Sequence, residues 1–441
     1  MKEWFYKTKW RWYHPQAFAR FAALKASEHL SLDELIVRQE SARQAIVRGA
    51  MEHTAFYPKF YGAVGFEIGD IGKEGWFERL PVVTKKELRE HFEEFIVPEE
   101  RQFLKISTTG GSTGTPTKTG YDGRAMEEIY SWRLQAWFGV HPWDDHAYIW
   151  RDTRTSKLAQ FKNAILWWPT KHLKLNASFI TEGAIVGFLR KYNRVKPNLL
   201  QGYVGAVTQV AQYAANHPGL LTPNPNLKCI WTTSAPISAV QRKLIESVFG
   251  ARVCDQYGSC EIRWIAQQCA ECGGLHVNVE HVNVEFVNEN NQSVPEGEYG
   301  RTLLTNLEEE VFPLIRYENG DRGRWLKKAC PCGRTLPCID SVKGRESESF
   351  VLPSGKTING EYLTTIFDTT PDLVRGFRVV QHKDASITIE YVPNVDGHEK
   401  EILKVLEAFS VRLGGEVPIE FKKVDSIPHD RGKLRFVVRE K

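Results

Sequence analysis

Short apolar segments alternate with helical patterns through the middle of this 441-residue chain, and this alternation constrains its fold class more than any other feature. Residues 147–150, 199–202 and 229–233 have the pattern of short buried strands. Strands that alternate with helices are typical of a largely parallel sheet covered by helices. The sequence therefore predicts an α/β core that extends to about residue 260.

Two capping boxes mark helix starts before this core. Ser31 with Glu34 predicts a helix that runs to about Met51, and Thr84 with Glu87 predicts a second helix. In such a box the hydroxyl and the carboxylate each satisfy a backbone N–H group that the first helical turn leaves unpaired. We therefore expect both helices to begin directly after the hydroxyl residue.

The predicted secondary structure changes after the α/β core. Residues 276–316 alternate in the manner of antiparallel strands, and the last 95 or so residues predict a strand, a helix near 397–413 and a further strand. A chain of this length exceeds one ordinary core. We expect a large N-terminal domain, residues 1–345, with α/β subdomains and a β-rich portion. A small α+β lid domain, residues 346–441, would follow it.

The N-terminal segment is rich in aromatic and basic residues. Trp4, Phe5, Trp10 and Trp12 are interspersed with lysines and an arginine. Two interpretations fit this composition, a membrane-surface anchor and a terminal arm packed on the main domain. The pattern favours the packed arm.

The overall composition narrows the function classes. Lys and Arg number 58 against 54 Asp and Glu, and this small, dispersed excess does not indicate nucleic-acid binding. No apolar stretch reaches the roughly 18 residues of a membrane span. The first residues also lack the apolar core of a signal peptide. We therefore expect a cytoplasmic protein without a transmembrane segment.

A run of hydroxyl and glycine residues, Thr109–Pro116, is the first candidate site. Glycines allow the backbone to approach an anion and to direct successive N–H groups toward it, and hydroxyls add further donors. The run lacks the Gly-Lys-Ser/Thr ending of a Walker A loop. It therefore predicts a phosphate-binding loop of another kind, with a flexible linker as the alternative.

Further short motifs follow this run along the chain. They are Thr233–Pro236, Tyr257–Glu261, Arg316–Asp321, Lys343–Arg345 and Arg431–Arg435. In this order and at these separations, the motifs resemble those of the adenylate-forming ligase superfamily. The resemblance covers almost the whole chain and is closest to the branch of phenylacetate–CoA ligases and CapK-type proteins of capsular polysaccharide loci.

The resemblance implies an ATP site and assigns residues to it. The ATP-binding residues would be Thr109, Gly110, Gly111, Ser112, Thr113, Gly114, Ser234, Ala235, Pro236, Tyr257, Gly258, Ser259, Asp321 and Arg345. Among them, Tyr257 would flank the adenine, Asp321 would accept both ribose hydroxyls, and Arg345 would contact the ribose or a phosphate.

The same resemblance implies two catalytic residues. Glu261 would bind Mg²⁺, which prefers hard carboxylate oxygens. Lys433 would be a mobile lysine that stabilises the phosphoryl group during transfer. Both reactants, the carboxylate and ATP, are anions that must be neutralised and aligned. A carboxylate that holds Mg²⁺ and a mobile lysine would supply the positive charge.

Cysteine and histidine residues form two short clusters. Cys269, Cys272 and His276 make one, and Cys330 with Cys332 makes the other. Such clusters are typical of a structural Zn²⁺ site, which takes four tetrahedral ligands. The resemblance favours Cys269, His276, Cys330 and Cys332. Spacing alone makes Cys272 an equally natural partner of Cys269, so both sets remain open.

The expected activity is that of an ATP-dependent acid ligase. It would form an acyl-adenylate from a carboxylate and pass the acyl group to a thiol such as CoA. One alternative is amide formation with an amine in capsule, exopolysaccharide or natural-product biosynthesis. Another is nucleotidyl transfer to a cofactor hydroxyl.

Overall fold

The computed structural model describes residues 1–108, 118–150, 162, 164–177, 180–271, 273–340, 342, 350–353, 357–358, 367, 370, 373–394, 398–412, 416–427, 429–430, 433–434 and 437–440. The chain divides into two compact units. The first unit consists of Met1–Lys9, Phe138–Asp255 and Lys343–Lys441. The second unit consists of Trp10–Trp137 and Gln256–Val342. This division differs from the expected domains 1–345 and 346–441, because the C-terminal segment is grouped with Phe138–Asp255. The expected separation of residues 346–441 as a lid domain stays a prediction.

The first unit contains five neighbouring strands of one sheet, three of which the sequence predicts. In spatial order they are β4 (His172–Asn176), β3 (His146–Trp150), β5 (Leu199–Tyr203), β6 (Cys229–Thr233) and β7 (Val253–Tyr257). The pairs β4–β3, β3–β5 and β5–β6 are parallel. Gly202 is required in β5, because a Cβ atom there would approach the Ile149 carbonyl oxygen to 2.7 Å.

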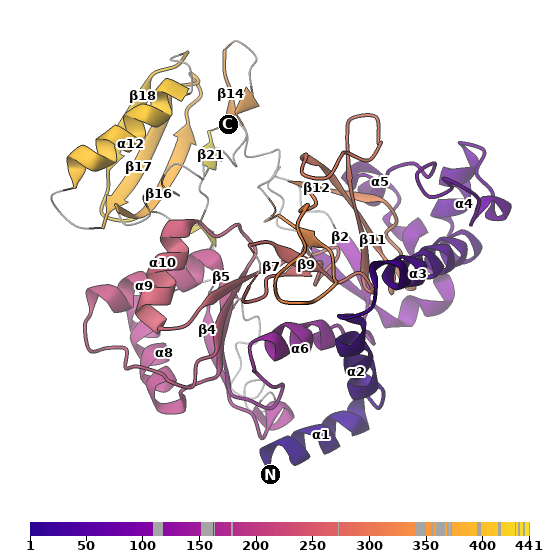
Figure 1. Ribbon diagram of the computed structural model, residues 1–441, viewed down its shortest axis with the longest axis horizontal. Helices are drawn as coiled ribbons and strands as arrows, with labels where there is room; N and C mark the ends of the chain where they lie inside the picture. Colours follow the sequence, from indigo (N-terminus) through magenta and orange to yellow (C-terminus); the bar gives the residue numbers. More distant parts are fainter. Residues whose placement is uncertain are drawn as a thin grey trace. The chain divides into compact units, whose positions relative to one another are not determined.

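Three amphipathic helices accompany these strands on one side (Figure 1). They are α8 (Glu182–Val195), α9 (Val204–Asn216) and α10 (Ala239–Phe249). Thr181 caps α8, Ser238 and Gln241 form a capping box on α10, and Gly250 ends α10 at a φ of 73°. Their buried apolar side chains form one core with the strands.

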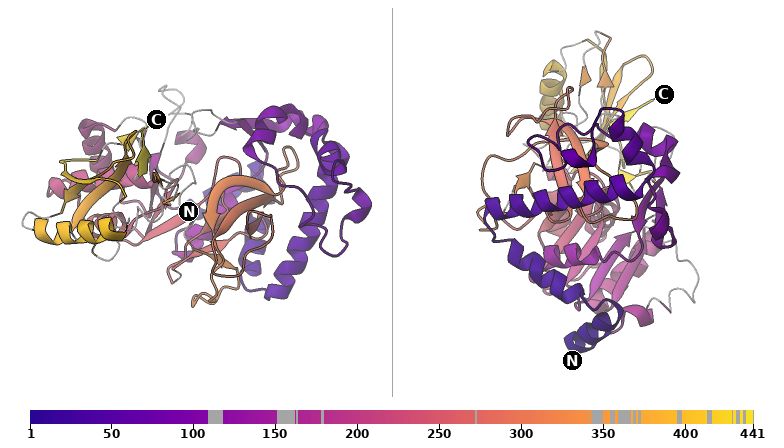
Figure 2. Two further views of the ribbon diagram at one scale, coloured as in Figure 1. Left: turned by 90° about the horizontal axis from the view of Figure 1, so that it is seen from above. Right: turned by 90° about the vertical axis from the view of Figure 1, so that its right-hand side faces the viewer.

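The C-terminal segment of the first unit has its own sheet. The strand order is β18 (Ile419–Lys423), β17 (Ile387–Pro393), β16 (Val374–Gln381) and β21 (Val437–Arg439). Helix α12 (Glu399–Arg412) lies along this sheet (Figure 2). Two short hairpins complete the described part, β14 (Phe350–Val351) with β15 (Thr357–Ile358) and β19 (His429–Asp430) with β20 (Lys433–Leu434).

The second unit begins with helical structure. Helix α1 (Lys2–Tyr13) runs into it from the first unit, and the remaining elements are α2 (Ala17–Ser27), α3 (Leu32–His53), α4 (Phe56–Gly62), η1 (Ile68–Asp70), α5 (Lys85–Glu90), η2 (Phe92–Phe95), η3 (Pro98–Phe103) and α6 (Glu128–Trp137). Both predicted capping boxes are confirmed, on α3 and on α5.

The remaining strands of the second unit are antiparallel. They are β1 (Leu104–Thr108), β2 (Lys118–Asp122), β8 (Ala266–Gln267), β9 (Leu275–Val277), β10 (Val282–Val287), β11 (Gly300–Asn306), β12 (Tyr317–Gly323) and β13 (Cys338–Ile339). The end of β7 pairs with β8. Strands β10, β11 and β12 form a sheet whose inner side chains join α3 and α4 in one core.

Candidate functional site

A hydrogen-bonded cluster joins the end of β7 to β12. The Tyr257 hydroxyl donates to Asp321 Oδ2 over 2.8 Å, and Asn319 Nδ2 donates to the same oxygen over 2.6 Å. The Asp321 backbone N–H donates to Asn319 Oδ1 over 3.0 Å. Burial, and then the neighbouring Asp321 carboxylate, raise the pKa of Tyr257 well above its ordinary value. The cluster therefore holds a neutral tyrosine against a fixed carboxylate.

Glu261 lies beside this cluster in sequence and has a similar partner. Its Oε1 accepts a hydrogen bond of 3.0 Å from the Tyr317 hydroxyl, and the residue is only 6% exposed. Its Oε2 is buried without a hydrogen-bond partner among the described residues. A buried carboxylate oxygen without a donor is costly unless a cation balances it. The residue therefore fits a Mg²⁺ ligand, since this cation prefers carboxylate oxygens.

The turn after β7 fixes the position of Glu261. The Ser259 N–H donates to the Ile262 carbonyl oxygen over 2.8 Å, and the Ile262 N–H donates back to Ser259 Oγ over 3.0 Å. A Cβ atom at Gly258 would lie 2.9 Å from Gln256 Nε2 and 3.1 Å from the Trp264 backbone nitrogen. Glycine is therefore required at this position by close approach.

Ser234, Ala235 and Pro236 belong to the first unit and follow β6 directly. Ser234 has a φ of 76°, which is uncommon for a residue with a Cβ atom. Such backbone strain is concentrated at functional sites. Both the backbone conformation and the sequence motif therefore make Ser234 a candidate site residue.

Four of the predicted metal ligands converge in the second unit. The ligand atoms of Cys269, His276, Cys330 and Cys332 all lie within 4.8 Å of one another. Cys269 Sγ is 3.5 Å from Cys330 Sγ, and Cys332 Sγ is 3.5 Å from His276 Nε2. Three thiols and one imidazole at these separations fit a tetrahedral Zn²⁺ site.

His276 is oriented so that Nε2 points into this cluster. Its other ring nitrogen, Nδ1, lies 3.1 Å from the Leu336 carbonyl oxygen and 3.3 Å from Cys338 Sγ. A metal-bound histidine commonly donates its second N–H group to a carbonyl oxygen in this way. Cys338 therefore contacts the outer side of the histidine.

Several predicted residues lie outside the described part of the chain. They are Thr109, Gly110, Gly111, Ser112, Thr113, Gly114, Cys272 and Arg345. The glycine run connects β1 to β2, which pair antiparallel up to Thr108 and Lys118. Lys433 begins β20.

Sequence reasoning gave no separate role to three residues that support the site. Tyr317 and Asn319 lie in the same motif as Asp321. Their polar side chains, so close to Asp321 in sequence, could have indicated that they hydrogen-bond to the site carboxylates. Lys85 is different, because it lies in the first turn of α5, and its Nζ donates to the Asn319 carbonyl oxygen over 2.8 Å. No local pattern could associate Lys85 with a residue so far along the chain.

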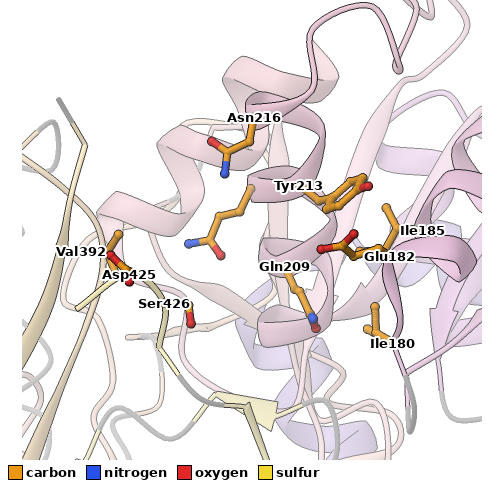
Figure 3. A pocket seen from close by; sticks show the side chains of 10 residues that line it. Ile180, Glu182, Ile185, Gln209, Tyr213, Asn216, Val392, Asp425 and Ser426 are labelled. Atoms are coloured by element: carbon orange, nitrogen blue, oxygen red, sulfur yellow. The ribbon is translucent and has the colours of Figure 1, made fainter.

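The first unit also contains a cavity of about 230 Å³ (Figure 3). Gln209, Tyr213 and Asn216 line it from α9, Glu182 lies at the start of α8, and Ser426 comes from the C-terminal segment. The predicted site residues that the structure describes are absent from its lining. We therefore place the candidate site at the Tyr257, Glu261 and Asp321 cluster and not in this cavity.

Comparisons with known proteins agree on one fold. The model of the CapK C-terminal domain matches residues 350–440. A phenylacetate-coenzyme A ligase of Thermus thermophilus is 24% identical over 402 residues, 88% of this chain and 86% of that protein. Protein CapK of Staphylococcus aureus is 23% identical over 82% of this chain and 79% of that protein. A solved structure of 2-hydroxyisobutyryl-CoA ligase with its acyl-adenylate has a TM-score of 0.79 at 21% identity, and covers 94% of this chain and 91% of that one. The predicted fold class is confirmed.

Proposed function

We propose that this chain, which belongs to the adenylate-forming family of phenylacetate–CoA ligases and CapK proteins, activates a carboxylic acid with ATP and passes the acyl group to a thiol such as CoA. One observation carries the proposal: Asp321 and Glu261 are two carboxylates that are each held by a tyrosine hydroxyl. Fixed carboxylates suit a ribose and a cation, which are two of the features that an ATP site must bind besides phosphate.

The reaction would take place in two steps. A carboxylate oxygen attacks the α-phosphorus of ATP, the bond to pyrophosphate breaks, and an acyl-adenylate forms. A thiolate then attacks the acyl carbon, and AMP leaves. Both steps bring anions together, so catalysis depends on alignment and on electrostatic stabilisation.

Each predicted residue has a role in this scheme. Asp321 would accept the ribose hydroxyls through its carboxylate, which Tyr257 and Asn319 hold in place. Glu261 would hold Mg²⁺, a cation that neutralises phosphate oxygens when it is bound. Residues Thr109–Gly114 would bind the β- and γ-phosphates, and Arg345 the ribose or a phosphate.

The small C-terminal domain would act as a lid. We place Lys433 on the transferring phosphoryl group and on the carboxylate, because a flexible ammonium group can be delivered for one step and then withdrawn. The family match to residues 350–440 supports this assignment, since it treats the segment as a domain of its own.

A structural Zn²⁺ would be held by Cys269, His276, Cys330 and Cys332. Four protein ligands leave no open position for water, so the ion would stabilise the fold and would not enter the reaction.

An amine is the second candidate acceptor. The resemblance to CapK-type proteins of capsular polysaccharide loci favours an acyl transfer connected with a polysaccharide, and the similarity to the CapK C-terminal domain and to protein CapK supports that resemblance. The first step would be unchanged, and only the attacking group would differ.

The test is exchange of labelled pyrophosphate into ATP with a panel of aryl, fatty, hydroxy and amino acids. We expect exchange with one class of acid, which would identify the donor. Product formation with CoA or with amino sugars would then identify the acceptor. Absence of exchange with every acid would contradict the proposed adenylation step.

A further inference from the structure

Helix α1 exposes large aromatic side chains on one face. Trp4 is 64% exposed and Trp12 is 84% exposed, and Phe5 is exposed between them along the helix. Residues that are four and eight positions apart lie on the same helical face. Aromatic residues of this size are normally turned toward the core, so the stripe is unusual for the outer side of a packed helix.

The opposite face of α1 is attached to the first unit. Tyr6 is buried, with its ring centroid 6.4 Å from that of Trp143. Lys2 Nζ forms a salt bridge of 2.5 Å with Asp145, and Lys9 Nζ donates to the carbonyl oxygen of Trp168 over 2.7 Å. The packed arm that the sequence favours is therefore present, but its packing leaves the aromatic stripe facing solvent.

A neighbouring segment extends the exposed apolar surface. Ile165, Leu166 and Trp168 are all exposed, and the ring centroids of Phe5 and Trp168 are 5.2 Å apart. The two segments thus meet through their aromatic rings. We call this surface the aromatic face and define it as Trp4, Phe5, Trp12, Ile165, Leu166 and Trp168.

Positive charge surrounds the aromatic face. Among the basic residues of 1–13, Lys2 is paired with Asp145 and Lys7 with Glu3, so the charges of Lys9 and Arg11 remain as the local positive excess. Residues 162–176 carry three lysines and no acidic residue, and both Lys162 and Lys171 are exposed. A surface that combines exposed tryptophan with lysine and arginine is suited to an interface between water and anionic headgroups.

We propose that the aromatic face binds the surface of a bilayer that contains anionic lipids. The indole rings would enter the headgroup region, and the surrounding lysine and arginine side chains would pair with lipid phosphates. Among the described residues, no helix is long and apolar enough to cross a bilayer, so the attachment would be peripheral. A second copy of this chain is a poorer occupant, because it would bring an identical basic surface.

This inference does not depend on the proposed function. Binding to a bilayer requires neither ATP nor the carboxylate cluster. Loss of ligase activity in a variant would therefore say nothing about it, and lipid binding is the measurement that tests it.

The experiment is flotation of the full chain with vesicles of phosphatidylcholine, with and without phosphatidylglycerol. We expect binding only when phosphatidylglycerol is present, and weaker binding in high salt because salt screens exposed charges. The double variant Trp4→Ser with Trp12→Ser should reduce partitioning at least about tenfold. Arg11→Glu should also reduce it at least about tenfold, since each basic residue near an anionic surface contributes to attraction.

A matched control removes exposed apolar side chains elsewhere. Ile36 and Val37 are exposed on α3, and Ile36→Ser with Val37→Ser should leave partitioning unchanged. Melting temperatures of all variants should equal that of the unmodified chain, since exposed residues are changed. Failure of the unmodified chain to float with anionic vesicles would overturn the proposal. An equal loss of vesicle binding in the Ile36→Ser with Val37→Ser control would also overturn it. A concentration-dependent dimer in sedimentation velocity that the tryptophan variant abolishes would overturn it as well.

Discussion

Tyrosine hydroxyls set the positions of both carboxylates in the candidate site. Tyr257 donates to Asp321, and Tyr317 donates to Glu261. Each hydrogen bond occupies one carboxylate oxygen and restricts the rotation of the side chain. At the scale of single residues, the site is therefore prepared before any ligand arrives, which lowers the entropic cost of binding.

Asp321→Ala should weaken ATP binding about tenfold or more, because the proposed ribose acceptor is lost. Tyr257→Phe should have a smaller effect, since the bond from Asn319 would still hold the carboxylate. Isothermal titration with ATP measures both. Glu318→Ala is the matched control, because Glu318 lies in the same strand and bonds to Arg301. Unchanged affinity in Asp321→Ala would remove Asp321 from the ATP site.

An ion pair between the buried His281 and the partly exposed Glu308 gives the second unit a pH-dependent stability. His281 Nδ1 is 3.2 Å from Glu308 Oε2, and His281 Nε2 is 2.9 Å from the Arg263 carbonyl oxygen, so both nitrogens face acceptors. Burial alone lowers the pKa of His281, but the bond to Glu308, the charges of Glu308 and Glu127 and the bond to the Arg263 carbonyl together raise the pKa above its usual value. Burial alone raises the pKa of Glu308, but its bond to His281 and the charges of His281 and Arg20 hold it at about 2.

Glu308→Gln should cost about 1–2 kcal/mol of unfolding free energy near pH 6. The histidine contribution is complete below about pH 6.5 and is lost as the pH rises through its raised pKa. The carboxylate contribution is present above about pH 4.3 and is lost as the pH falls toward 2. Urea unfolding at several pH values should therefore show the largest difference between these limits. A difference that does not vary with pH would contradict the ion pair.

At the scale of elements, the proposed zinc site joins segments with little regular structure. The nearby strands β8, β9 and β13 contain only two or three residues each. Strands this short gain little from their own hydrogen bonds, so side chains between them must hold the segments together. A tetrahedral ion bound by Cys269, His276 and the pair Cys330 and Cys332 would do so.

Metal analysis of the purified chain should give about one zinc ion per molecule. Cys330→Ser with Cys332→Ser should lower both the zinc content and the melting temperature, because structural zinc contributes directly to folding. Cys260→Ser is the control, since Cys260 is exposed and does not belong to the four proposed ligands. A stable, metal-free chain would refute the site.

At the scale of the whole molecule, the predicted catalytic residues are distributed over both units. Glu261 and Asp321 belong to the second unit, whereas β20 with Lys433 belongs to the C-terminal segment of the first. The proposed mechanism therefore assigns nucleotide binding and phosphoryl stabilisation to different parts of the chain. A substitution could therefore abolish phosphoryl stabilisation and leave nucleotide binding intact.

Lys433→Ala should reduce pyrophosphate exchange by at least about a thousandfold, because the developing charge on the phosphoryl group would lose its cation. ATP affinity should change little, since the other proposed contacts remain. Exchange kinetics and titration with ATP together check this prediction. Undiminished exchange would exclude Lys433 from catalysis, and a large fall in ATP affinity would give it a binding role.

The sequence alone determined the features that depend on neighbouring residues. The capping boxes at Ser31 and Thr84 and the strands at 147–150, 199–202 and 229–233 are confirmed, because their hydrogen bonds and apolar patterns are local. Spacing and resemblance also predicted a cluster of Cys269, His276, Cys330 and Cys332, and these four residues lie close together. The zinc ion itself stays a prediction, and Cys272 lies outside the described residues. The loop Thr109–Gly114 and the role of Arg345 stay predictions.

Only the tertiary structure decided which distant residues meet. Asp321 lies 64 positions from Tyr257 and Glu261 lies 56 from Tyr317, and Lys85 reaches the same motif from an early helix. The aromatic face also depends on packing. Helix α1 has aromatic residues on both sides, so the sequence does not decide whether Tyr6 or Trp4 is buried. The physical reason is common to all of these cases. Local patterns fix backbone hydrogen bonds, whereas burial and side-chain pairing depend on contacts that form only when the chain is folded.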